Sequence, residues 1–160
     1  MILVDSSVWI DFFRHGKNAQ SQALARCLGD ASVDIGMADL VLFEVMRGFR
    51  EGVLMREAQT LMSALPQVEI GGTAHVLKAV QRYRQLRQSG RTVHSPIDVL
   101  LASYCITHGH TLLHRDADFE LLKNLGGLDT WPHWKNQEAK HDSTHHHKPR
   151  RHSYPHALPP

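Results

Sequence analysis

The sequence predicts an α/β domain in which a central, mainly parallel sheet of four or five strands lies between two layers of helices. Short apolar runs, typical of buried strands, alternate along the chain with longer segments in which apolar residues recur at helical spacing. This alternation favours a parallel sheet covered on both faces. The 160 residues suit a single domain, and we find no internal repeat. In such sheets, functional groups gather at the carboxyl ends of the strands.

The first half of the chain contains two predicted strands and four predicted helices. Ser6 or Ser7 is the expected cap of the first helix, because a hydroxyl can accept a hydrogen bond from the first turn. Gly29 and Pro66 each end a helix, since glycine favours helix C-termini and proline cannot continue a helix. In chain order we expect a strand at 2–4, helices at about 8–13 and 19–28, a strand at 33–35, and helices at 39–49 and 51–65.

The second half continues the alternation. Ser95, Pro96 and Asp98 form a strong helix start: a capping hydroxyl, a proline at the first position and an acid in the first turn. Gly109 is placed to end that helix. In chain order we expect a strand at 68–70, a long amphipathic helix at 73–89, a helix at 96–108, a strand at 111–113 and a short helix at 116–122.

The composition indicates a cytoplasmic protein without a membrane segment. No apolar run approaches the roughly 20 residues needed to cross a bilayer. Asp5 interrupts the first apolar run after four residues, which does not match a secretory signal. Cys27 and Cys105 lie in apolar helical segments without CxxC spacing, and this favours buried free thiols in a reducing compartment.

Residues 131–160 differ in composition from residues 1–130, which we expect to form the folded domain. From Trp131 onward there are five basic and two acidic residues, whereas the preceding part has 13 basic and 14 acidic ones. This basic tail is rich in histidine and proline and lacks an apolar period, so we expect it to be disordered. A histidine-rich tract can also bind metal, and the basic charge can add non-specific affinity for nucleic acid.

Five acidic side chains stand where a functional site is expected. Asp5 directly follows the first strand, and Asp116 and Asp118 follow the last. Glu44 lies in a mostly apolar helical stretch, and Asp98 is in the first turn of a helix whose next residues are nearly all apolar. Each acid alone is explained as a turn residue, a helix cap or half of a surface ion pair. Taken together, they predict an acidic cluster at the carboxyl ends of the strands.

Such a cluster favours metal-assisted phosphodiester hydrolysis. Crowded buried carboxylates repel one another and take up protons unless a cation compensates their charge. Mg²⁺, with Mn²⁺ as a substitute, prefers oxygen ligands; it can activate water and neutralise charge at phosphorus. The sequence has no glycine-rich phosphate loop, no GxSxG and no HExxH, which argues against NTPases, serine hydrolases and zinc peptidases.

Four segments together resemble the PIN-domain family and, more narrowly, the VapC-type toxin ribonucleases of toxin–antitoxin pairs. These segments are residues 2–10, 44–48, 98–102 and 114–119, within a resemblance that covers roughly residues 1–130 in order and spacing. The resemblance implies a three-layer PIN-like fold and a Mg²⁺-dependent endoribonuclease. It also implies a homodimer that is held inactive by a cognate antitoxin.

The resemblance assigns roles to the acidic residues. Asp5 and Asp98 correspond to the principal metal ligands, and Glu44 and Asp116 complete the catalytic cluster. Asp116 is also expected to bind metal, and Asp118 is a fifth, outer member of the set.

Candidate RNA contacts are Ser6, Arg47, Arg84, Arg87 and His114. Arg47 follows Glu44 by about one helical turn and can contact a phosphate or balance the carboxylates. Arg84 and Arg87 can line one rim of an acidic groove, or belong to an ordinary solvated helix face. The family usually has threonine or serine where this chain has His114, which can donate a hydrogen bond in place of that hydroxyl.

Two other functions stay open at this stage. A catalytically degenerate PIN domain would bind RNA or an antitoxin without cutting, and a haloacid-type phosphatase would use Asp5 as its nucleophile. The second is disfavoured because Ser7 stands where that class has another acid. A partner helix is suggested by apolar and methionine-rich surface, unless these residues form core or a dimer interface: Phe43, Met46, Phe49, Val53, Leu54, Leu61 and Met62.

Overall fold

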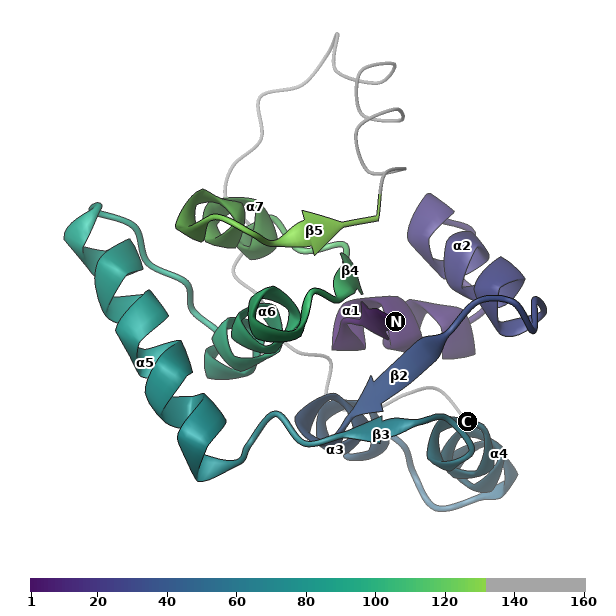
Figure 1. The fold of residues 1–160 in the computed structure, drawn as a ribbon. Helices are drawn as coiled ribbons and strands as arrows, with labels where there is room; N and C mark the ends of the chain where they lie inside the picture. Colours follow the sequence, from purple (N-terminus) through teal and green to yellow (C-terminus); the bar gives the residue numbers. More distant parts are fainter. Residues whose placement is uncertain (132–160) are drawn as a thin grey trace, which may run out of the picture.

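A computed structural model describes residues 1–131, apart from the side chain of Asn124, and confirms the α/β fold class. Its centre is a five-stranded sheet in the order β3-β2-β1-β4-β5, and all four strand pairs are parallel (Figure 1). The strands are β1 Ile2–Val4, β2 Ile35–Ala38, β3 Gln67–Val68, β4 Thr111–Leu113 and β5 Asp129–Thr130.

The helices form two groups on opposite faces of this sheet. The connections from β1 to β2 and from β2 to β3 run toward one edge, whereas those from β3 to β4 and from β4 to β5 run back toward the other. Right-handed crossovers therefore place the first four helices on one face and the remaining helices on the other. The helices are α1 Ser6–Phe13, α2 Ala19–Leu28, α3 Asp39–Met46, α4 Val53–Ser63, α5 Thr73–Gln88, α6 Pro96–His108, α7 Asp118–Leu122 and the 3₁₀ turn η1 Lys123–Leu125.

The core fills the space between the sheet and both helical layers. Leu3 on β1 and Leu112 on β4 are fully buried and lie opposite each other in the sheet. Trp9 on α1 and Phe119 on α7 are also fully buried. Trp9 packs against Phe12 and Phe13, so these aromatic residues belong to the interior as their helical spacing indicates.

The two central strands, β1 and β4, end at the same level of the sheet. β1 pairs with β4 in register up to Val4 opposite Leu113. One residue beyond, the N–H of Asp5 donates to the carbonyl of Leu113 at 2.9 Å. The chain leaves β1 toward one edge of the sheet and leaves β4 toward the other, and such a change of direction is the usual ligand site of an open parallel sheet.

Two strands begin at positions that differ from the sequence prediction. β2 starts at Ile35 instead of residue 33 and continues through Gly36, where a Cβ atom would stand 2.3 Å from the sulfur of Met1. The sequence prediction placed this strand too early because Gly36 weakens the β signal, although a side chain at this position would crowd those of Met1 and Leu3. β3 ends at Val68, because the N–H of Ile70 donates instead to the carboxylate of Asp39 at 2.9 Å.

Other details follow from local hydrogen bonding. Asp5, not a serine, is the N-cap of α1: its carboxylate accepts the N–H of Ser7, and Ser6 is already helical. The strand β5 was not expected from the sequence. It pairs with β4, and Trp131 continues the contact by donating its N–H to Leu112. The predicted tail at 131–160 lies outside the described residues except for Trp131.

Cys27 and Cys105 are buried free thiols, as expected. Burial raises the pKa of both thiols, that of Cys105 to about 12, so these sulfurs are poor nucleophiles. Within residues 1–131, none of the helices combines the length and apolar character that a bilayer crossing requires.

Replacing Leu3 by alanine is expected to lower the free energy of unfolding by about 2–5 kcal/mol, because it leaves a cavity between the central strand and its helices. Urea unfolding measures this change. Leu77→Ala is the matched control, since Leu77 is 61% exposed on α5, and should alter the value by no more than about 0.5 kcal/mol. Equal losses in the two variants would contradict this account of the core.

Candidate active site

Asp5 is fixed at the junction of β1 and α1. Its backbone is extended, with φ −68° and ψ 152°, and its Oδ2 accepts hydrogen bonds from both the N–H and the hydroxyl of Ser7. The side chain is buried, and desolvation raises the pKa of this carboxyl above its usual range, although the bonds from Ser7 act in the opposite direction. Asp5 is thus both a helix cap and a buried acid.

Asp98 reaches the same region from the opposite face of the sheet. Ser95 caps α6 and accepts the N–H of Asp98 at 3.2 Å, as the sequence predicts. The carboxyl is 7% exposed, and its pKa is raised to about 8, first by burial and then by the negative charge of Asp5. The charges of Asp116 and Glu44 raise it further, while a hydrogen bond from Ser95 lowers it.

Glu44 is contributed by the middle of α3. Burial raises the pKa of its carboxyl, and the nearby charge of Asp5 raises it further. The hydroxyl of Ser6 donates to this carboxyl, and the guanidinium of Arg47 lowers the pKa by its positive charge. One oxygen, Oε2, is buried without a hydrogen-bond partner. A buried carboxylate oxygen left unbonded is costly, so this atom is available to a donor or a cation.

Asp116 lies in the loop between β4 and α7. Its Oδ1 accepts the N–H of Asp118 at 2.9 Å, and the side chain is partly exposed. The loop is joined to α1 by an ion pair between Arg115 and Asp11, and Asp11 also accepts a hydrogen bond from Asn18 at 2.8 Å. The loop that bears Asp116 is therefore attached to the helix that begins at Asp5.

Four of the five predicted acids meet at the carboxyl end of the sheet. Asp116 raises the pKa of Asp5, Asp5 raises that of Glu44, and all three raise that of Asp98. These mutual effects require short separations, because charges in water are screened over about 10 Å. We call Asp5, Glu44, Asp98 and Asp116 the acidic cluster; its members come from four different elements of the fold.

Asp118 is directed elsewhere. Its Oδ2 accepts the backbone N–H of His94 at 3.2 Å and lies 3.7 Å from the His94 ring nitrogen Nδ1. Its charge is not among the main influences on the pKa of Asp5, Glu44 or Asp98. Asp118 therefore stands at the edge of the acidic cluster and links it to the segment before α6.

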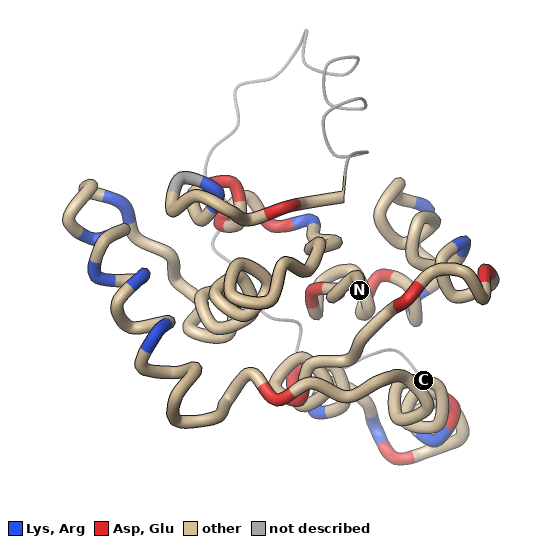
Figure 2. Tube along the Cα trace, viewed as in Figure 1, with Lys and Arg blue, Asp and Glu red and all other residues tan. Residues whose placement is uncertain are grey.

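The predicted basic contacts lie at different distances from the cluster. Arg47 is near enough to lower the pKa of Glu44, and its guanidinium lies 5.9 Å from the centre of the Phe43 ring. Arg84 and Arg87 are exposed on α5, which carries a row of basic residues (Figure 2). Arg87 donates to the hydroxyl of Thr92. Neither of these α5 arginines is a main influence on the pKa values of the cluster.

The structure places His114 and Ser6 inside the protein. His114 is 2% exposed, and its ring packs on Phe119 with 4.9 Å between centroids. Its Nδ1 lies 3.0 Å from the carbonyl oxygen of Asp116, which holds the turn that presents the Asp116 side chain. Burial lowers the pKa of His114 to about 4, so the ring is neutral at pH 7. Ser6 is likewise buried, with its hydroxyl on Glu44.

The sequence analysis did not assign Ser7, Ser95 or His94 to the site. Ser7 and Ser95 donate hydroxyl hydrogen bonds to Asp5 and Asp98, respectively. A local signal exists for both, because a serine two residues after or three residues before an acid at a helix start is well placed to bond it. His94 is adjacent to Asp118 only through the tertiary fold.

The donor set suits a hard divalent cation. Three carboxyls with raised pKa values, those of Asp5, Glu44 and Asp98, and one unbonded buried oxygen are features that a bound cation would compensate. Within residues 1–131, however, no three His, Cys, Asp or Glu side chains are arranged to hold an ion by themselves. Mg²⁺ fits this condition, because it commonly binds one or two carboxylates and keeps several waters.

A protein-family model described as the PIN domain matches residues 2–125. The chain belongs to the PIN-domain family. Two curated relatives are the VapC ribonuclease Mb1587 of Mycobacterium bovis and the ribonuclease VapC11 of Mycobacterium tuberculosis. Each is 30% identical to this PIN-domain protein over 128 residues, which are 80% of this chain and 96% of the relative.

Solved structures agree on the PIN fold. VapBC2 from Rickettsia felis, bound to a DNA fragment from its promoter, has a TM-score of 0.61 at 17% identity, covering 82% of this chain and 98% of the other. DNA-bound VapBC from Salmonella typhimurium has a TM-score of 0.63 at 16% identity, covering 81% and 96%. At these identities the likeness concerns the fold.

Burial of Asp98 is expected to make the metal-free protein lose stability as pH rises. Unfolded Asp98 titrates near 3.8 and folded Asp98 near 8, so the folded state holds an extra proton between these values. The free energy of unfolding therefore falls as pH increases from about 4 to about 8, by about 1.4 kcal/mol for each pKa unit of the shift. Urea unfolding in EDTA at pH 5 and at pH 8 measures the difference.

Asp98→Asn should flatten this pH dependence, because the amide does not titrate. Glu57→Gln, which removes an exposed acid on α4, should leave the dependence unchanged. An equal pH dependence in the unaltered protein and in Asp98→Asn would contradict the assigned burial of this carboxyl.

Proposed function

We propose that this protein is a divalent-metal-dependent endoribonuclease of the VapC type, with the acidic cluster as its catalytic centre. The observation that carries the proposal is that four mutually repelling acids, contributed by four different elements of the fold, lie close together. Such repulsion is tolerated in a folded protein when a cation compensates it. The relatives are named ribonucleases, and they match the chain over nearly their whole length.

The chain's own groups would hold the metal and orient the substrate. Asp5, Asp98 and Asp116 supply the carboxylate ligands, Glu44 completes the negative charge, and Asp118 stands at the edge. When bound, Mg²⁺, or Mn²⁺ in its place, activates water and stabilises the charge that develops at phosphorus. Hydrolysis of the RNA backbone is expected to leave a 5′-phosphate and a 3′-hydroxyl.

Serine hydroxyls keep the acids in position before the metal binds. Ser7 donates to Asp5, Ser6 to Glu44 and Ser95 to Asp98. Each bond favours the ionised carboxylate, so it partly offsets the effect of burial. The neutral ring of His114 fixes the backbone at Asp116. Arg47 beside Glu44 is the basic group best placed to meet a phosphate, and Arg84 and Arg87 offer more distant phosphate contacts.

A phosphatase that uses Asp5 as its nucleophile is less compatible with the structure. One Asp5 oxygen already accepts two hydrogen bonds from Ser7, and the carboxyl is buried with a raised pKa. Both features make it a poor nucleophile. A degenerate PIN domain that binds without cutting would lack metal binding, so the next experiment separates it from the proposed enzyme.

Purified protein is expected to cut total RNA into discrete fragments in Mg²⁺ and not in EDTA. Asp5→Asn and Asp98→Asn should reduce cleavage about 1,000-fold or more, which corresponds to about 4 kcal/mol of transition-state stabilisation. Asn is an N-cap residue as good as Asp, so Asp5→Asn should retain the fold. Fragment mapping measures cleavage, and thermal unfolding with and without Mg²⁺ measures metal binding.

Glu57→Gln is the matched control, because it removes one negative charge outside the acidic cluster. It should cut RNA like the unaltered protein. Cleavage that survives in Asp98→Asn would contradict the assignment of the cluster. If the unaltered protein shows no cleavage and no Mg²⁺-induced shift in thermal unfolding, the degenerate, binding-only function is favoured.

The surface of α3 and α4 fits an antitoxin segment. Three of the residues expected there are exposed: Phe43 by 59%, Val53 by 60% and Leu54 by 53%. Met62 is fully buried, so its inclusion in that surface was wrong. A hollow beside Phe43 is lined by Leu42, Met46 and Met55, adaptable side chains that suit an apolar helix. Two solved structures that resemble this chain are VapBC complexes.

Phe43→Glu is expected to weaken binding of a candidate antitoxin at least tenfold, because it places a charge in the apolar contact. Leu77→Glu, at an equally exposed leucine on α5, is the control and should leave binding unchanged. Isothermal titration measures both, and equal effects would contradict this location. We also propose that the protein forms the homodimer that the family resemblance implies and that it is cytoplasmic. Sedimentation tests the dimer, and cell fractionation tests the location.

A further inference from the structure

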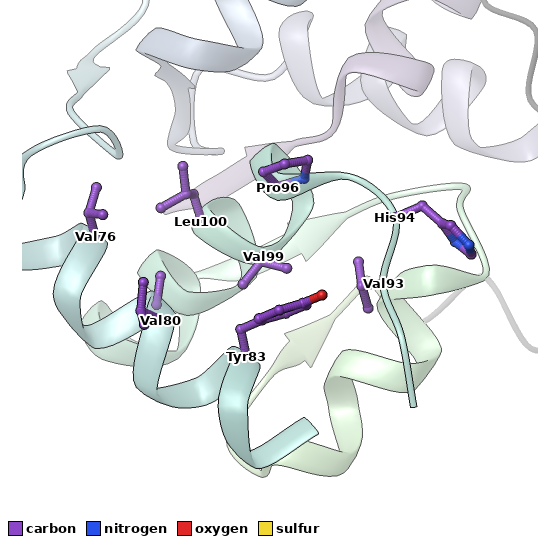
Figure 3. A pocket seen from close by; sticks show the side chains of 9 residues that line it. Val76, Val80, Tyr83, Val93, His94, Pro96, Val99 and Leu100 are labelled. Carbon is purple, nitrogen blue, oxygen red and sulfur yellow. The ribbon is translucent and has the colours of Figure 1, made fainter. Parts of the chain in front are cut away.

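An apolar cavity of about 350 Å³ opens between α5 and α6 (Figure 3). This volume is at the lower end of the roughly 300–1,000 Å³ that is typical of small-molecule sites. Its walls come from two helices and from the segment that precedes α6. The lining side chains are Val76, Ala79, Val80, Tyr83, Val93, His94, Pro96, Val99 and Leu100.

The cavity lies near the N-terminal end of α6, where this helix also carries Asp98 on its opposite, sheet-facing side. Pro96 and Val99 line it from the same turn of α6 that carries Asp98. At the other side, His94 contacts the carboxylate of Asp118 through its backbone N–H, and Asp118 in turn bonds the carboxylate of Asp116. The His94 end of the cavity is therefore linked to Asp116 through two hydrogen bonds.

Charge and shape limit what can enter. The interior is aliphatic except for the ring of Tyr83, which extends from α5 across the cavity toward Val93, and the imidazole of His94 (Figure 3). Outside the cavity, α5 carries the exposed Arg84 and Arg87, one and four residues after Tyr83. A flat, uncharged group suits the apolar interior, and an anionic backbone attached to that group suits the arginines outside.

We propose that this cavity is a nucleobase subsite, which takes one unstacked base of an RNA strand whose backbone also passes the acidic cluster. The base would lie against Tyr83 with aliphatic contacts from Val80 and Val99, and the flanking phosphates would face the arginines of α5. This inference rests on the proposed ribonuclease function. Base contacts of this kind accept every base, because each has an apolar face.

Two exposed residues of α5 can show whether this face binds a nucleobase or a second copy of the chain. Val80 is 41% exposed and lines the cavity, whereas Leu77, 61% exposed on the same helix, does not. A second copy docked on this face would cover both side chains, but a base would touch only Val80. Because Val80 is partly exposed, a larger side chain at this position should fill the opening of the cavity without disturbing the buried core.

The experiment compares Val80→Trp with Leu77→Trp in an Asp5→Asn background, which is expected to bind RNA without cutting it. Fluorescence anisotropy in Mg²⁺ gives the affinity for short single-stranded RNA oligonucleotides, intact or with one abasic site at each position in turn. We expect Val80→Trp to weaken binding about 5- to 150-fold, the range for one stacked base. Leu77→Trp should change it less than about twofold, since it lies outside the cavity.

The abasic oligonucleotides test the same contact without altering the cavity. In the protein that retains Val80, an abasic site at one position should weaken binding by a similar factor. For the Val80→Trp protein, that abasic oligonucleotide should bind no more weakly than the intact one. RNA binding that is unaffected by Val80→Trp and by every abasic site would overturn the subsite but leave the ribonuclease proposal standing.

Two other outcomes have distinct meanings. Absence of RNA binding in the Asp5→Asn protein itself would count against the proposed function as well as the subsite. If Val80→Trp and Leu77→Trp both dissociate a dimer in sedimentation and leave RNA affinity unchanged, the face joins two copies of the chain and the subsite is wrong.

Discussion

The parallel pairing of β1 with β4 positions most of the site. Because the two strands are in register up to Val4 and Leu113, they end together, and the N–H of Asp5 donates across to Leu113. Asp5 and the loop bearing Asp116 are then neighbours in space although more than 100 residues separate them in sequence. The helices α3 and α6 approach this point from opposite faces of the sheet and bring Glu44 and Asp98 to it.

The acidic cluster opposes the stability of the fold that builds it. Burial and mutual repulsion raise the pKa values of Asp5, Glu44 and Asp98, so the ionised cluster is unfavourable without a cation. Three serine hydroxyls reduce this cost, and an ion pair between Arg115 and Asp11 holds the loop of Asp116. Local disagreement with the rules of a stable core is expected at functional sites, and here it has a clear electrostatic origin.

The sequence predicted the fold class and the four cluster acids because both depend on short-range patterns. Apolar runs and capping residues are visible along the chain, and acids at strand ends are rare enough to notice. It placed β2 too early, because Gly36 weakens the strand signal although the backbone there lies close to the side chains of Met1 and Leu3. It also predicted Asp118 as an outer metal ligand and His114 as an RNA contact; it did not predict that Asp118 would accept a hydrogen bond from His94 or that the ring of His114 would be buried.

The sequence by itself therefore determined which residue types are available and which element carries each of them. Hydrophobic periodicity sets the elements, and their order sets a parallel sheet with a common carboxyl edge. Only the tertiary structure decided which side chains meet, because contacts such as those of Ser6 with Glu44 and His94 with Asp118 join segments with no shared local pattern. The apolar cavity between α5 and α6 has the same origin, because it exists only where these two helices pack together.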